Sequence, residues 1–338
     1  MKQANHPKIP SRSAFRSLGV SLLLCCLGIG IVLFNQIHRD GNNWFGQSSS
    51  DFRSIPPEWI TYRQTSVFDS PVEGQPTCFA LLNNSTFVVG SANPHTLSLF
   101  DEKGTLLRKV NLSEEPRAIA CGTDEIIIAH PKQIAVYDAE GNRKHAWKLP
   151  SVNSNIRNLV LMSDYLFAVD SDNRRIHRYT LEGHRDLTFD VQDFVVYAAP
   201  ITMTFSSVDG LLYITNPGKH RVEVFTQDGE YHPELGFGEP SGNLSGFVGC
   251  CNPIDVVALN DGRILTVEKS VARIKIYTQD GQLDCVVAGP DVLDNPPLPI
   301  QGGRYFSAVQ MSDGRIAVFD FDGQRIRLFS PKTNLPVL

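Results

Sequence analysis

Two adjacent cysteines, Cys250 and Cys251, have the most unusual chemistry in this sequence. They lie in a long glycine-rich segment, FGEPSGNLSGFVGCCNP, at residues 237–253. Neighbouring thiols can form a strained disulfide with each other, or they can bind a metal or the edge of a haem. Alternatively, one of the two is structural and pairs with another cysteine, of which Cys285 is the nearest in sequence. Exposed, strained disulfides are readily reduced. One hypothesis is therefore a redox or electron-transfer accessory that uses this pair.

Three histidines form a second candidate site. His95, His130 and His220 each lie in a turn between two short predicted strands. If they converge, three imidazoles can bind zinc and leave a fourth position open, as in a zinc-dependent lyase or hydrolase. Nothing in the local sequence fixes that convergence, and the alternative is that they are ordinary exposed loop histidines. The sequence suggests no cofactor other than this zinc ion.

The elements that would position these residues belong to a repeated unit. In each copy a strand ends in apolar-x-apolar-aromatic, and in five of the six copies a glycine follows four residues after the aromatic residue. Each copy follows a hairpin of two short strands joined by a polar turn, as in IDVVALNDGRILTV. The aromatic residues are 37 to 52 residues apart, at Phe100, Tyr137, Tyr179, Phe225, Tyr277 and Phe329.

A further strand follows the glycine, as at residues 282–288. Six units of four strands predict an all-β, six-bladed β-propeller over residues 57–338. The last copy is too short for a good fourth strand, whereas residues 59–68 precede the first hairpin and have no partner. Because propellers avoid an open edge by closing the ring, we expect the two ends of the domain to share one blade.

Several units resemble NHL repeats, in which a strand ending in Asp is followed by a short turn and Asn/His-Arg-Ile-x-x-aromatic. The resemblance is clear in FAVDSDNRRIHRYTLEG, YITNPGKHRVEVFTQDG and AVFDFDGQRIRLF. It implies a six-bladed propeller, but NHL domains include protein-binding modules, RNA-binding modules and a zinc-dependent amidating lyase with channel histidines. The run GCCNP, together with Thr266, Glu268 and Lys269, resembles a group of membrane-anchored bacterial NHL proteins.

In a propeller of this kind, two sets of loops gather around one mouth of the central channel, where ligands usually bind. One set leads into the innermost strands, and the other joins the second and third strands. We expect both sets to bring polar side chains to this rim. The candidate ligand-binding or redox residues there are Cys250, Cys251, Arg304, Tyr305, Glu115 and Lys269.

An acid and an arginine recur five residues apart, across the turn between the second and third strands. This spacing brings the two ends of the turn together, so we expect each pair to form an ion pair. A feature that repeats from unit to unit is more easily explained as structural than as catalytic. The three pairs are Asp170 with Arg175, Glu268 with Arg273, and Asp320 with Arg325.

The N-terminal residues predict a membrane anchor. A basic tail at residues 1–17 precedes an uncharged run, LGVSLLLCCLGIGIVLF, at residues 18–34. A helix of this length rises about 25 Å, near the lower limit for crossing a bilayer. A cleaved signal peptide is the alternative, but the residues that follow make a poor cleavage site. The basic tail predicts that residues 1–17 stay in the cytoplasm and that the propeller lies on the periplasmic or extracellular side. The polar residues 35–56 between anchor and propeller predict a stalk.

Composition and charge argue against several functions. The chain of 338 residues has a net charge of −5 and lacks the basic surface of a nucleic-acid-binding protein. It contains no C-x-x-C, no phosphate-binding G-x-x-x-x-G-K-[ST] and no G-x-S-x-G. The favoured function is a membrane-tethered scaffold that binds a protein or a small molecule at the propeller rim and needs no catalytic group.

Overall fold

The computed structural model describes residues 53–70, 72–191, 193–195, 199–269, 271–295 and 304–332. The predicted tail and anchor, and the stalk up to residue 52, lie outside these residues. In the part of the chain that is described, no helix is long and apolar enough to cross a membrane. The described residues form an all-β domain with two short helical turns, η1 (Pro57–Trp59) and α2 (Pro290–Leu293).

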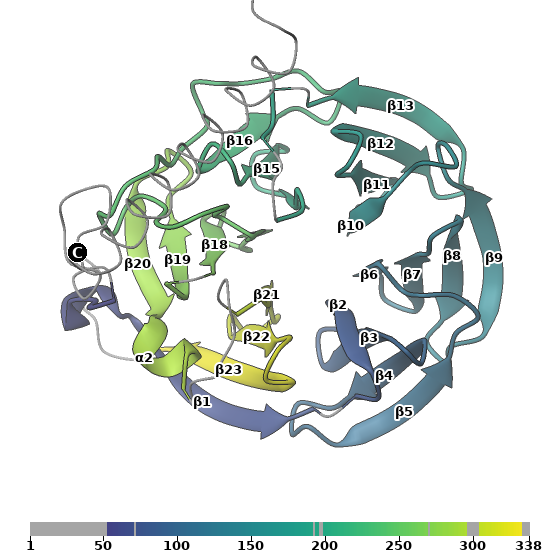
Figure 1. Cartoon of the computed structure of the whole chain (residues 1–338), viewed down its shortest axis with the longest axis horizontal. Helices are drawn as coiled ribbons and strands as arrows, with labels where there is room; N and C mark the ends of the chain where they lie inside the picture. The colour runs from purple at the N-terminus through teal and green to yellow at the C-terminus, as the bar shows by residue number, and fades with distance from the viewer. Residues whose placement is uncertain are drawn as a thin grey trace, which may run out of the picture. The chain divides into compact units, whose positions relative to one another are not determined.

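Six antiparallel sheets surround a common centre, which confirms the predicted six-bladed propeller (Figure 1). Blade one contains β2 (Gln75–Leu82), β3 (Thr86–Ala92), β4 (Thr96–Phe100) and β5 (Leu106–Asn111). Blade two contains β6 (Ala118–Cys121), β7 (Glu125–Ala129), β8 (Gln133–Asp138) and β9 (Arg143–Lys148). Blade three contains β10 (Ile156–Leu161), β11 (Tyr165–Asp170), β12 (Arg175–Thr180) and β13 (Arg185–Asp190). Blade four contains β14 (Met203–Phe205), β15 (Leu212–Asn216) and β16 (Arg221–Phe225). Blade five contains β17 (Asp255–Ala258), β18 (Ile264–Glu268), β19 (Arg273–Tyr277) and β20 (Leu283–Ala288). Blade six contains β21 (Phe306–Gln310), β22 (Ile316–Asp320), β23 (Arg325–Pro331) and β1 (Tyr62–Asp69).

The hydrophobic core is divided among the interfaces between neighbouring blades. One apolar cluster joins blades one and two, another joins blades two and three, and the series continues around the ring to blades six and one. A middle strand is therefore covered on both faces. This explains why β7 reads as a continuous apolar run, Ile126-Ile127-Ile128, in which every side chain is buried.

The repeated glycine has two structural causes. Gly183 and Gly229 both have φ near +85°, which side chains adopt only with strain. A Cβ atom at either position would also collide with an aromatic ring of the preceding blade, Trp147 in β9 for Gly183 and Phe189 in β13 for Gly229. The glycine is thus required both by the turn between the last two strands and by the close contact between blades.

The ring is closed by strands from the two ends of the domain. β1 pairs antiparallel with β23, in a register that runs from Tyr62 opposite Pro331 to Asp69 opposite Arg325. β1 therefore supplies the outermost strand of blade six (Figure 1). The prediction that the two ends share one blade is confirmed, and the strand is displaced slightly from the predicted residues 59–68.

Blade four departs from the predicted four strands. Its sheet contains only β14, β15 and β16. In place of a fourth strand, isolated bridges join Tyr231 to Phe225 and Phe237 to Val222. Five residues separate Tyr231 from Phe237, whereas only two separate Val222 from Phe225, so the two segments cannot stay in register as a continuous ladder.

The predicted acid–arginine pairs are correct in one blade and wrong in two. The two residues of each pair lie opposite each other in all three blades. Their side chains form an ion pair only in blade five, between Glu268 and Arg273. In blades three and six the arginine pairs with an aspartate of the outermost strand.

Candidate functional site

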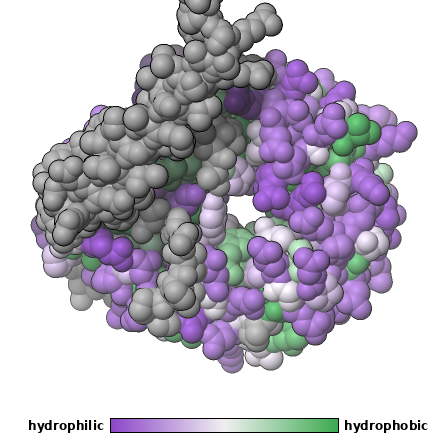
Figure 2. Space-filling view, viewed as in Figure 1, coloured by the Kyte–Doolittle hydropathy of each residue, from purple (hydrophilic) through white to green (hydrophobic). Residues whose placement is uncertain are grey.

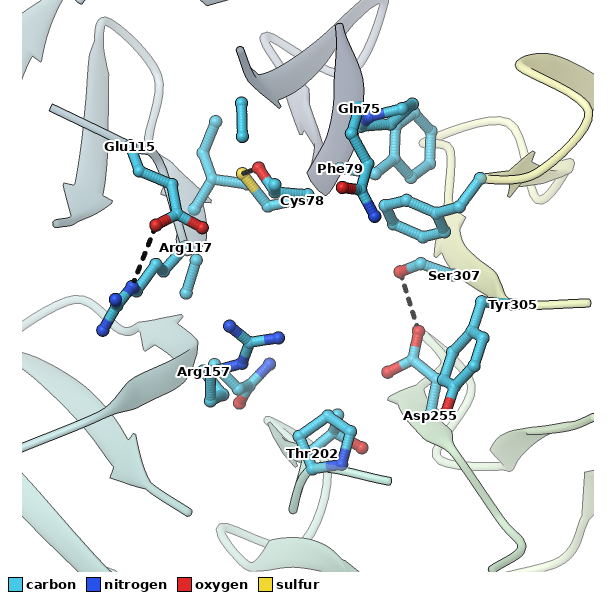
Figure 3. A pocket seen from close by; sticks show the side chains of 18 of the residues that line it. Gln75, Cys78, Phe79, Glu115, Arg117, Arg157, Thr202, Asp255, Tyr305 and Ser307 are labelled. Atoms are coloured by element: carbon cyan, nitrogen blue, oxygen red, sulfur yellow. Dashed lines mark hydrogen bonds and ion pairs between the residues drawn. The ribbon is translucent and has the colours of Figure 1, made fainter. Parts of the chain in front are cut away.

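The innermost strands surround a cavity of about 560 Å³ at the mouth of the central channel. Figure 2 shows an opening at the centre of the ring, and Figure 3 shows the side chains around the cavity. The wall combines residues from loops that lead into innermost strands with residues from loops between second and third strands, as predicted. These residues are Gln75, Glu115, Pro200, Tyr305, Asn93, His95 and Asp322.

In every blade, one residue at the equivalent position, in or directly before the innermost strand, lines this cavity. Two of these side chains tie neighbouring blades together. The Asn158 Oδ1 atom accepts a hydrogen bond from the backbone N–H of Met203 at 3.1 Å. The Asp255 Oδ2 atom accepts one from the backbone N–H of Ala308 at 3.2 Å. The full set is Cys78, Ala118, Asn158, Thr202, Asp255 and Ser307.

Asp255 is the acid whose environment is most unusual in this cavity. Its Oδ2 atom also accepts a hydrogen bond from the Ser307 hydroxyl at 2.8 Å, drawn as a dashed line in Figure 3. Burial raises the pKa of Asp255 to about 6, although the hydrogen bonds from Ser307, Ala308 and Val256 oppose this rise. Asp255 was not among the residues predicted from the sequence, where the available signal was a single acid within the apolar run Ile254-Asp255-Val256-Val257.

Two arginines supply positive charge to the same cavity. Arg117 contacts Glu115, with 3.5 Å between Nε and Oε2, and donates a hydrogen bond to Asn155 at 3.2 Å. Arg157 projects from β10 toward the middle of the cavity (Figure 3) and is exposed there. No hydrogen bond or ion pair joins its guanidinium to another described residue. The strand pattern Ile156-Arg157-Asn158-Leu159 carried a signal for this residue, but it was not among the predicted candidates.

Four of the predicted site residues lie together at the junction of blades five and six. The sulfur atoms of Cys250 and Cys251 are 2.9 Å apart. The Lys269 ammonium acts electrostatically on Cys250 and donates a hydrogen bond to the Tyr305 hydroxyl at 3.0 Å. The same ammonium is 4.9 Å from the centroid of the Tyr305 ring. Because Tyr305 also lines the cavity, this cluster borders the channel mouth.

The other two predicted residues have contacts that explain them structurally. Arg304 is buried, pairs with Asp320 at 3.0 Å and donates a hydrogen bond to the backbone oxygen of Leu293. It therefore fastens α2 to blade six. Glu115 lines the cavity, but its carboxylate is directed to Arg117.

The three histidines occupy different environments. The Nδ1 atom of His130 donates a hydrogen bond to the backbone oxygen of Glu115, and its Nε2 atom accepts one from Tyr137, both at 3.1 Å. Burial lowers the pKa of His130 and of His220. Only His95 lines the cavity. No group of three potential metal ligands occurs among the described residues, so the convergence that a zinc site would require is not seen there.

Comparisons with known proteins support the fold. No protein-family model matches the chain, and no curated protein matches it. A catalytically inactive variant of virginiamycin B lyase from Staphylococcus aureus, solved with quinupristin, has a TM-score of 0.56 and 16% identity, covering 78% of this chain and 83% of the other. The Pan2 WD40 domain of Neurospora crassa has a TM-score of 0.51 and 10% identity, covering 81% and 96%. At such identities the similarity concerns the fold alone, and the resemblance to NHL repeats stays a prediction.

Proposed function

We propose that this protein is a membrane-tethered, extracytoplasmic propeller that acts as a scaffold by binding an anionic ligand at the mouth of its channel. The observation that carries the proposal is the Arg157 guanidinium, which is exposed in the cavity and has no hydrogen bond or ion pair to the described residues. A carboxylate or similar anion would give it the bidentate partner that guanidinium groups favour. The tether and its orientation rest on the basic tail and the apolar run of the N-terminal sequence.

The neighbouring polar groups favour binding over catalysis. Asn158 and Asp255 hold adjacent blades together, and Glu115 is directed to Arg117. Groups that serve the ring in this way are poorly placed to move protons during a reaction. They can instead keep the wall rigid, so that Arg157 is presented to a ligand in a fixed position.

The proposal is tested by calorimetric titration of the full-length chain in detergent with citrate, succinate and sulfate as probes. We expect at least one of these anions to bind, and Arg157→Gln to weaken its binding roughly 10- to 100-fold because a charge-assisted hydrogen bond is lost. Arg175→Gln is the matched control, because Arg175 pairs with Asp190 away from the cavity lining. This control should bind as the unmodified protein does.

Two results would contradict the proposal. One is that none of the three anions binds the unmodified protein. The other is that Arg157→Gln binds them with unchanged affinity, which would place the binding elsewhere on the surface.

A further inference from the structure

The segment at residues 249–252 holds two thiols in contact while exposing only one of them. The Cys250 and Cys251 sulfur atoms are 2.9 Å apart. Cys250 is exposed, whereas Cys251 retains only 2% of its accessible surface. An external reagent can therefore approach Cys250, and the Cys251 sulfur is already next to the Cys250 sulfur.

The backbone at this pair is held in an unfavourable conformation. Cys251 has φ of +62°, in the left-handed region that non-glycine residues rarely adopt. The buried side chain of Asn252 fixes the turn from the other side. Its Nδ2 atom donates hydrogen bonds to the backbone oxygens of Val248 and Lys269, and its Oδ1 atom accepts one from the Lys269 N–H at 2.9 Å. Strain that the surroundings maintain in this way is typical of functional sites.

We propose that Cys250 and Cys251 form a dithiol site that is oxidised reversibly to a disulfide by exchange with small-molecule disulfides. Two neighbouring residues have Cα atoms about 3.8 Å apart. Ordinary disulfides join Cα atoms roughly 4.4–6.8 Å apart, so a bond between neighbours is strained and easily reduced. A bond of this kind suits repeated oxidation and reduction better than permanent cross-linking.

The exchange proceeds in two balanced steps. The Cys250 thiolate attacks one sulfur of the small disulfide, forms a mixed disulfide and releases one small thiolate. The Cys251 thiolate then attacks the Cys250 sulfur, which breaks the mixed disulfide and releases the second small thiolate. Two protein thiols are oxidised, one small disulfide is reduced to two thiols, and the two protons pass to solvent or to the departing thiolates.

The charges around the pair predict how the rate depends on pH. The neighbouring Cys251 thiol raises the pKa of Cys250 and burial adds to this rise, whereas the Lys269 ammonium opposes it. Since the thiolate is the reactive form, the rate should increase steadily as the pH rises from about 7 to 9. Lys269→Met should slow the reaction at neutral pH about two- to fivefold, because it removes the charge that favours the Cys250 thiolate.

Three other cysteines provide internal controls. Cys78 and Cys285 are buried, and burial raises the pKa of Cys78 to about 12 and that of Cys285 to about 11. Burial raises the pKa of Cys121 as well. Thiols whose pKa values are raised by burial react slowly, so in the folded protein Cys250 should be alkylated by iodoacetamide at least about 100-fold faster than these three.

The experiment equilibrates the full-length chain in detergent with mixtures of reduced and oxidised glutathione, blocks remaining thiols with iodoacetamide and maps the peptides by mass spectrometry. We expect a Cys250–Cys251 disulfide that appears and disappears reversibly with the glutathione ratio. Cys251→Ser should accumulate glutathione on Cys250, because the resolving thiol is gone. Cys250→Ser should form neither product.

Several outcomes would overturn the proposal. They are the absence of the disulfide at every glutathione ratio, a stable glutathione adduct on Cys250 of the unmodified protein, or a cross-link from either residue to Cys285. Because Cys251 is buried, Cys251→Ser is first checked for folding by circular dichroism. Even if that variant fails to fold, the peptide map of the unmodified protein shows whether the Cys250–Cys251 disulfide forms and is reduced again.

Discussion

Blades three and six differ from blade five in how they use the same acid–arginine spacing. In blade three Arg175 turns to Asp190 of the outermost strand, at 2.8 Å. In blade six Arg325 turns to Asp69 of β1, at 2.9 Å. Both of these pairs are at least partly exposed. In blade five Arg273 turns to Glu268, at 2.7 Å, with both side chains almost completely buried.

The outermost strand explains the difference. β13 and β1 each place an aspartate opposite the arginine of their blade. In blade five β20 ends with Ala288 opposite Ile274, and the residue that follows is Gly289. Without an acid on that side, Arg273 binds the carboxylate of its own hairpin.

The loop at residues 237–253 then covers this pair and makes it part of a larger buried network. Lys275 lies 3.0 Å from Glu268 and donates hydrogen bonds to the backbone oxygens of Gly246 and Leu244. Its ammonium is also 4.4 Å from the centroid of the Phe247 ring. Arginines at the same five-residue spacing thus form partly exposed ion pairs in blades three and six, and a buried ion pair that holds a loop in blade five. The outcome depends on whether the outermost strand supplies an acid and whether a loop covers the pair.

The largest effect should come from removing the only carboxylate of the network. Glu268→Gln leaves Arg273 and Lys275 buried without a counter-charge, so we expect the free energy of unfolding to fall by about 3–5 kcal/mol. Chemical denaturation of the full-length protein measures this change. A loss below about 1 kcal/mol would show that the buried network behaves like the surface pairs.

A smaller effect should appear in the pH dependence of stability. Burial lowers the pKa of Lys275 to about 7; Arg273 acts in the same direction, and Glu268 opposes it. Between pH 7 and 9 the unfolded chain therefore binds more protons at Lys275 than the folded protein does, and stability rises with pH through this window.

Lys275→Met should abolish that rise, which we expect to be on the order of 1–3 kcal/mol. Denaturation curves at pH 7, 8 and 9 for both proteins isolate the contribution of Lys275, since other titrating groups are common to the two. Parallel pH profiles would contradict the lowered pKa of Lys275.

The smallest effect belongs to the surface pairs. Arg175→Ala and Arg325→Ala should each lower the free energy of unfolding by less than about 1 kcal/mol, because solvent already stabilises both partners. The same denaturation assay measures these variants. A loss of several kcal/mol for either variant would show that the surface pairs contribute as much to stability as the buried network of blade five.

The sequence predicted those features that depend on repetition and spacing. The aromatic residues and the glycines after them marked six units, because each glycine is needed both by a turn and by contact with the blade before it. The unpaired segment ahead of the first hairpin predicted the closure by β1. Side-chain partners across blades could not be predicted, since Asp190 and Asp69 become neighbours of their arginines only after the strands are assembled.

The candidate site was predicted less completely than the fold. Cys250, Cys251, Lys269 and Tyr305 were named separately because they lie in loops of recognisable position, and their contacts with one another were not predicted. Arg157 was missed because it lies in an innermost strand, where one polar residue among apolar ones is easily assigned to the core. Which strand residues face the channel depends on the pleat and on a local bulge in β10, and single-sequence patterns do not fix either.

The pairing of β1 with β23 has a consequence for how the chain is made. Asp69 and Arg325, which meet at the end of this ladder, are 256 residues apart in sequence. The first strand of the domain is therefore synthesised early and has no partner until nearly the whole chain has been produced. Until then its backbone donors and acceptors remain available to other strands. Completion of the ring is a late step in folding, and a chain that ends before β23 cannot reach it.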